Sequence, residues 1–191
     1  MERKEQLCRA IKKIGWGYVF LYFNINLGTI NIMPAWIGYI LFYQAIRDGI
    51  SQEEESAGLL KTIGIILGIY NGITWLLSMI AIPAEIFLIS EVISVISLYY
   101  HFQLLTNLAN IAKRYQCFQE EKALLHLRTW QTILLTILAF MVQIEALYEW
   151  SLVLVFVQCI IMVCICVYLR KLKHALEDLP DIIFTSKEYI C

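Results

Sequence analysis

The chain has 191 residues, of which 60% are hydrophobic and 16% charged, with a mean hydropathy of +0.67 and a formal net charge of −1. Soluble domains of this size carry about 25% charged and about 45–50% apolar residues, so the composition argues against a soluble domain. The basic residues stand dispersed beside the ends of apolar stretches and form no basic patch, which argues against nucleic acid as a partner.

The first apolar stretch, residues 14–46, carries no charge and is too long for one ordinary membrane span and short for two. A turn containing Gly28 and Pro34 divides it, because Gly and Pro mark turns and Asn bonds to its own backbone. We therefore expect short helices at about 10–25 and 33–48. The polar residues of the turn are Asn24, Asn26 and Asn31.

An acidic run follows the second helix. Ser51 and Glu54 have the spacing of a capping box that starts a new helix. Glu53 and Glu55 stand beside them, and the run as a whole is typical of a solvated loop on the cytoplasmic side. A cluster of catalytic carboxylates is the alternative, but partner His and Asn residues at matching spacing are missing from the sequence.

The third helix, at about 60–80, carries a glycine at every fourth position: Gly64, Gly68 and Gly72. This spacing puts the three glycines on nearly one face, where a neighbouring backbone can approach closely. The pattern predicts helix packing and no chemistry. The partner is either another helix of the same chain or a second protomer.

The fourth helix, at about 84–110, concentrates polar residues on one face, within an arc of roughly 60° at 100° per residue. Those residues are Ser90, Ser94, Ser97 and His101, with Glu91 at the margin. Ionisable groups inside spans are costly and usually face a cavity or a partner. Alternatively, Glu91 is protonated and bonded to a neighbouring helix, and His101 is an interfacial hydrogen-bonding residue. No second histidine stands at metal-ligand spacing, so we expect no metal site and no cofactor.

The remaining chain predicts two further spans. Residues 119–128 have the pattern of a short amphipathic helix on the inner surface. The fifth and sixth spans follow at about 129–147, which includes Gln143, and 150–169. The sequence therefore predicts a single all-α domain over residues 1–191, a polytopic bundle of six transmembrane helices.

The positions of the Lys and Arg residues predict the topology. All fifteen stand before the first apolar stretch or after the second, fourth or sixth, and the other three turns contain none. Because Lys and Arg are enriched in cytoplasmic loops, both termini are expected to be cytoplasmic.

The segment NINLGTINIMPAWIGYILFYQAI, residues 24–46, resembles the opening of uncharacterised small integral membrane proteins of Clostridia-like Firmicutes. Those proteins often carry an Asn-rich turn followed by a Pro, an aromatic residue and Ile-Gly-Tyr. The resemblance covers the first quarter of the chain. It implies a protein of the bacterial plasma membrane and assigns no reaction.

Three functions remain open at this level. The first is a small-molecule binding or transport module, since length and span number are similar to those of the substrate-binding subunits of energy-coupling factor vitamin transporters. Its candidate ligand-binding residues are Asn24, Asn26, Asn31, Glu91, Ser94, His101 and Gln143. The second is a non-catalytic regulator, immunity factor or assembly subunit that binds a membrane partner or a second copy through the glycine face. The third is a membrane enzyme using Glu91 and His101, about 15 Å apart along one helix.

Overall fold

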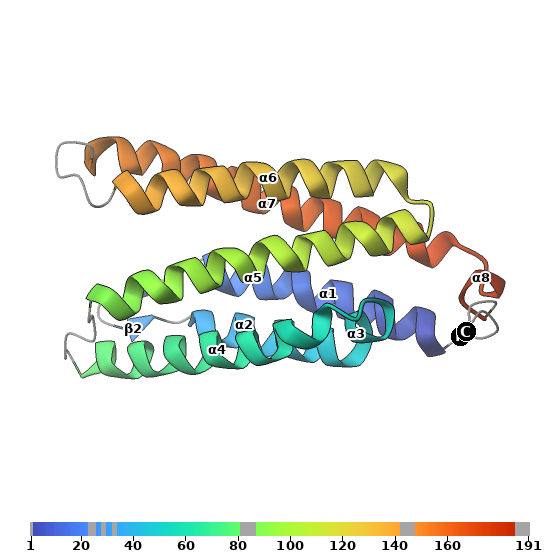
Figure 1. The fold of residues 1–191 in the computed structure, drawn as a ribbon, viewed down its shortest axis with the longest axis horizontal. Coiled ribbons are helices and arrows are strands. Elements are labelled where there is room, and N and C mark those ends of the chain that lie inside the picture. Colours follow the sequence, from blue (N-terminus) through green and yellow to red (C-terminus); the bar gives the residue numbers. More distant parts are fainter. Residues whose placement is uncertain are drawn as a thin grey trace.

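The computed structural model describes residues 2–22, 26–27, 30–31, 34–80, 87–141 and 148–185, and within them the fold is a bundle of long helices (Figure 1). The long helices are α1 (Glu2–Tyr22), α2 (Ala35–Ala45), α4 (Ala57–Met79), α5 (Phe87–Arg114), α6 (Phe118–Met141) and α7 (Tyr148–Asp178). The short elements are strands β1 (Asn26–Leu27) and β2 (Ile30–Asn31), the π-helix η1 (Ile46–Ile50), α3 (Ser51–Glu53) and α8 (Ile182–Thr185). The all-α class is therefore confirmed, apart from one pair of two-residue strands.

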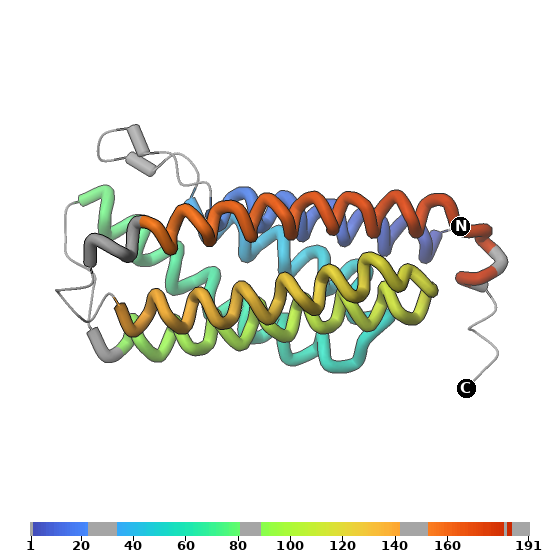
Figure 2. The backbone as a smooth tube through the Cα atoms, turned by 90° about the horizontal axis from the view of Figure 1, so that it is seen from above, coloured from blue at the N-terminus to red at the C-terminus, as the bar shows by residue number. Residues whose placement is uncertain are grey.

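The long helices form a closed ring. Each packs against the next in chain order, and α7 packs against α1 to complete the circle. Figure 2 shows α7 and α1 lying side by side along most of their length. The start of α1 and the end of α7 consequently share one end of the bundle, where Lys4 Nζ lies 3.2 Å from Asp181 Oδ1.

By length and composition, four helices of the described residues can cross a membrane, and not the six predicted. They are α4, α5 from Ile89, α6, and α7 from Val153. The other two predicted spans, α1 and α2, do not meet these criteria, for different reasons. α1 carries charged side chains through its first three turns, and α2 has 11 residues where a span needs about 20.

Two predicted boundaries were wrong. The first helix begins at Glu2 rather than near residue 10, because charged residues of its first turn have partners on other elements, such as Glu53 for Arg3 at 2.8 Å. Residues 119–128 are not a separate surface helix: they form the first turns of α6, with Leu124 buried in the bundle. No Gly or Pro separates them from the apolar residues that follow.

The predicted capping box was also wrong. Ser51 lies in α3, where its hydroxyl donates to the Arg47 carbonyl oxygen at 3.4 Å. That carbonyl belongs to the π-helical turn η1, which continues α2 directly, so the chain is helical without a break from Ala35 to Glu53. α4 starts after Ser56, whose side chain makes no capping bond.

Glycines set the closest helix contacts. A Cβ at Gly38 would lie 2.7 Å from the Gly17 carbonyl oxygen, so α1 and α2 touch backbone to backbone. The predicted glycine face of α4 packs within the chain, less tightly. There a Cβ at Gly64 would lie 3.2 Å from the Tyr100 hydroxyl, one at Gly68 3.4 Å from Tyr39 Cβ, and one at Gly72 3.9 Å from Trp36 Cβ.

Candidate ligand-binding cavity

A cavity of about 950 Å³ lies in the half of the bundle away from the termini. Its wall consists of Leu21 and Tyr22 from α1, Ala35 and Tyr39 from α2, Tyr70 and Asn71 from α4, Ser90, Glu91, Ile93, Ser94, Val95, Ser97, Leu98 and His101 from α5, and Leu135, Thr136, Leu138, Ala139 and Phe140 from α6. In Figure 1, α5 and α6 lie close together at the turn that joins them and diverge away from it. The volume is within the range of about 300–1,000 Å³ that holds small ligands.

The polar face predicted on α5 forms one wall of this cavity. Ser90, Ser94, Ser97 and His101 recur at intervals of four, three and four residues, which keeps them on one side of an α-helix. Glu91 borders the same space. The structure therefore brings together the predicted site residues Glu91, Ser94 and His101.

The other predicted site residues cannot be placed beside them. Asn26 and Asn31 pair across β1 and β2, but their side chains lie outside the described residues. Asn24 and Gln143 lie outside the described residues altogether. A ligand-binding role for Asn24, Asn26, Asn31 and Gln143 therefore remains a prediction.

His101 lies at the deep end of the cavity and is 2% exposed. Tyr18, Tyr22, Tyr39, Phe42 and Tyr100 surround it, with ring centroids 5.5–6.4 Å from the imidazole. Neither ring nitrogen has a hydrogen-bond partner among the described residues. A buried polar group without a partner costs about 1–3 kcal/mol, so folding leaves hydrogen-bonding capacity unused at this position.

Several cavity hydroxyls donate their hydrogens to the protein. Ser94 donates to the Ser90 carbonyl oxygen at 2.9 Å, and Thr136 donates to that of Thr132 at 2.8 Å. A hydroxyl has one hydrogen and two lone pairs, so these oxygens can still accept. At these two positions the wall therefore offers a ligand acceptors.

Hydrogen bonds to neighbouring helices position two tyrosines of the cavity wall, Tyr39 and Tyr22. The Tyr39 hydroxyl lies 3.2 Å from Ser97 Oγ, which fixes α2 to α5. The Tyr22 hydroxyl accepts from Gln131 Nε2 at 3.3 Å, which fixes α1 to α6. Sequence reasoning missed both tyrosines as site residues, since no motif marks them and only the order of the ring brings them to α5.

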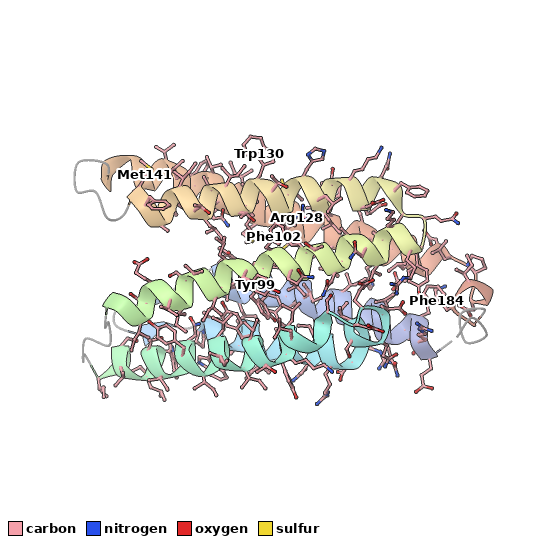
Figure 3. All side chains as sticks on the ribbon, in the orientation of Figure 1. Tyr99, Phe102, Arg128, Trp130, Met141 and Phe184 are labelled. Atoms are coloured by element: carbon pink, nitrogen blue, oxygen red, sulfur yellow. The ribbon has the colours of Figure 1, made fainter. Side chains whose placement is uncertain are left out.

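The base nearest the cavity along α6 is Arg128, whose buried Nε has no hydrogen-bond partner among the described residues. Figure 3 shows Arg128 beside Phe102, between α5 and α6. Its guanidinium lies 4.3 Å from the centroid of that ring, and Nη1 donates to Thr106 Oγ1 at 3.0 Å. Among the described residues that line the cavity, Glu91 is the one acid, and no Lys or Arg is present.

A second buried polar cluster lies at the opposite end of the bundle. The Glu53 carboxylate accepts from Arg3 Nε at 2.8 Å, Arg114 Nη1 at 3.2 Å and the Tyr115 hydroxyl at 3.1 Å. Burial, together with the neighbouring Glu53 charge, raises the pKa of Tyr115 well above its usual range. Because every oxygen of Glu53 has a donor, the cluster joins helices and leaves little capacity for a ligand.

No three His, Cys, Asp or Glu side chains of the described residues lie close enough together to hold a metal ion. Comparison with models of known protein families, with curated proteins and with solved structures finds no match.

Proposed function

We propose that this chain is a small-molecule binding or transport module of the bacterial plasma membrane. The observation that carries the proposal is His101, which borders a cavity of about 950 Å³ and has two ring nitrogens without a partner among the described residues. Most buried polar groups in proteins have a partner, so two unpaired nitrogens that border a cavity call for an explanation, and a bound ligand is one. A ligand that reaches the deep end of the cavity would provide the missing partner.

The proposal includes six spans with both termini on the cytoplasmic side. α1 and α2 reach the same end of the bundle as α4 and α5, and the helix from Ala35 to Glu53 is continuous, which supports a full crossing by this pair. The charged first half of α1 would then lie at the cytoplasmic surface, with its long side chains reaching the interface. The location follows from the distribution of bases and the resemblance of residues 24–46.

The glycine face gives the alternative function less support. Gly64, Gly68 and Gly72 contact α5 and α2 of the same chain, so they are not available to a partner. An enzyme would need Glu91 and His101 to act on one substrate, and both border one cavity. However, the two residues stand ten positions apart on α5, about 15 Å along the helix axis, which is too far for a direct hydrogen bond. We therefore retain the binding or transport module.

His101→Phe tests the proposal. The purified protein in detergent is screened by thermal melting against a panel of metabolites and vitamins, and we expect at least one ligand to raise the melting temperature. Phe keeps the ring contacts and removes both nitrogens, so the ligand-free variant should be equally stable or more stable while the ligand-dependent shift is lost. His126→Phe, at an exposed position of α6, is the matched control. A panel without any shift, or a shift that survives in His101→Phe, contradicts the proposal.

A further inference from the structure

An arginine without an acid partner lies beside the deep end of the cavity. Arg128 belongs to α6, a helix long and apolar enough to span a membrane, and no ion pair among the described residues includes it. Its guanidinium packs on the Phe102 ring at 4.3 Å and Nη1 donates to Thr106 Oγ1, but the buried Nε has no partner among those residues. A charged side chain inside a span is costly and usually marks a site for a substrate or an ion.

Neighbours on α5 and α6 connect Arg128 to the cavity. Phe102, beside which Figure 3 shows Arg128, directly follows His101 of the cavity wall. Gln131 stands three positions after Arg128, about 4.5 Å along the axis and on the same side of α6. Its Nε2 donates to the hydroxyl of Tyr22, which also lines the cavity. Arg128 therefore lies within about one helical turn of the deep end.

Further hydrogen-bond donors gather around Tyr22. A neutral imidazole carries one N–H, and neither nitrogen of His101 has a partner among the described residues. Gln158 of α7 approaches the Tyr22 hydroxyl and is 4% exposed, with neither amide atom in a hydrogen bond of good geometry to those residues. Gln131 Oε1 is also unpaired, and turning that amide over would let Tyr22 donate to Oε1 and free both N–H groups. Three helices can thus direct donors to one place.

The acid of the cavity wall lies far from this place. Glu91 stands ten positions before His101 on α5, about 15 Å along the helix axis, and it already interacts within the protein. Because the Coulomb energy falls with distance, repulsion over this separation is weaker than attraction to a charge a few ångströms away. An anion at the deep end would therefore experience Arg128 more strongly than Glu91.

An organic acid satisfies both the charge and the donors. A carboxylate only accepts hydrogen bonds, and a bond from the Arg128 Nε–H would leave the two present contacts of the guanidinium intact. Tyr39, Tyr70, Phe140 and the aliphatic side chains of α5 and α6 provide a wall for an apolar body. We infer, on the basis of the proposed function, that the cavity binds an organic acid. Arg128 and His101 hold its carboxylate at the deep end, and the apolar body lies along the wall.

Acids and their own amides separate charge from shape. The pairs are indole-3-acetate with indole-3-acetamide and 4-phenylbutyrate with 4-phenylbutyramide. Isothermal titration calorimetry on the full-length protein in detergent at neutral pH gives the dissociation constants. We expect at least one acid to bind at least about tenfold more tightly than its amide, a difference of about 1.4 kcal/mol. Equal affinities, tighter binding of the amides, or no binding by either acid overturns the inference, while the metabolite panel tests the proposed function independently.

Replacing Arg128 assigns the preference to one side chain. Arg128→Gln should bind acid and amide with similar affinity, and its retained amide binding shows that it is folded. Arg128→Lys keeps the positive charge and should still favour the acid severalfold. Arg170→Gln, at an exposed position of α7, is the matched control and should keep the tenfold preference. A preference that survives in Arg128→Gln, or that is lost in Arg128→Lys or in Arg170→Gln, overturns the inference and leaves the binding function standing.

Discussion

Arg3 and Glu53 lie fifty positions apart in the sequence, yet Arg3 Nε donates to Glu53 Oε1 at 2.8 Å. The Glu53 side chain is 1% exposed, and Arg114 approaches its other oxygen from α5. One carboxylate therefore connects the first turn of α1, the end of the continuous helix from Ala35 to Glu53, and the end of α5.

Replacing this carboxylate should weaken the whole end of the bundle at which the termini lie. Glu53→Gln removes the negative charge but leaves two guanidinium groups facing each other. Breaking a buried ion pair costs about 3–5 kcal/mol, and since Arg3 and Arg114 are about one-third exposed, we expect a loss near the lower limit. Thermal melting in detergent measures the loss. Glu55→Gln, which is exposed, should leave the melting temperature within a degree or two, and an equal loss in both variants would contradict the assignment.

Tyr115 should make the stability of the same cluster depend on alkaline pH. Its hydroxyl donates to Glu53, and its pKa is raised by burial and by that neighbouring charge. A group with a raised folded-state pKa contributes fully below its unfolded value, about 10 for tyrosine, and the contribution is lost as the pH rises further.

The test compares the wild type with Tyr115→Phe, which keeps the stacking on Phe184 at 4.6 Å between centroids. At pH 8 the variant should be less stable by about 1.5 kcal/mol, the contribution of a hydrogen bond to a charged acceptor. The difference should shrink as the pH rises above 10, because only the wild type has this phenol to ionise. Chemical unfolding between pH 8 and pH 11 follows the difference, and a constant difference would show that Tyr115 is not perturbed.

The sequence predicted those parts of the site that lie on one helix. A 3.6-residue period was enough to place Ser94 and His101 on one face of α5, where the structure has the cavity. Tyr22 and Tyr39 come from other helices, and their position depends on which helices become neighbours in the ring. That order is set by packing between residues far apart in sequence, which the local pattern does not encode.

Glu53 illustrates the same limit. An acidic run between two helices is usually solvated, and nothing within a few residues of Glu53 indicates otherwise. Its burial depends on Arg3 and Arg114, which are 50 and 61 positions away. The prediction of a solvated loop was wrong for this residue because its partners are supplied only by the assembled bundle.

Replacing Gly38 tests the backbone contact between α1 and α2. Alanine there would place Cβ 2.7 Å from the Gly17 carbonyl oxygen, a backbone atom that cannot turn aside, so α1 and α2 must separate. We expect Gly38→Ala to lower stability by about 1–3 kcal/mol, the usual cost of overpacking. Gly58→Ala in α4 meets no atom within 4 Å and should stabilise by about 0.5–1 kcal/mol through helix propensity. Denaturation in detergent compares the two, and similar melting temperatures would show that the α1–α2 contact is looser than described.

Cysteine labelling distinguishes six spans from four. The six native cysteines are replaced by serine, and one cysteine is introduced at a chosen position. In the six-span arrangement the β1–β2 turn lies outside the cell, so Leu27→Cys should react with a membrane-impermeant maleimide on intact cells. Gln119→Cys, at the start of α6 beside the termini, should react only after the membrane is opened. Labelling of position 27 only in opened membranes would mean that α1 and α2 do not cross. The cavity would then be formed by four spanning helices and a hairpin that enters from the cytoplasmic side.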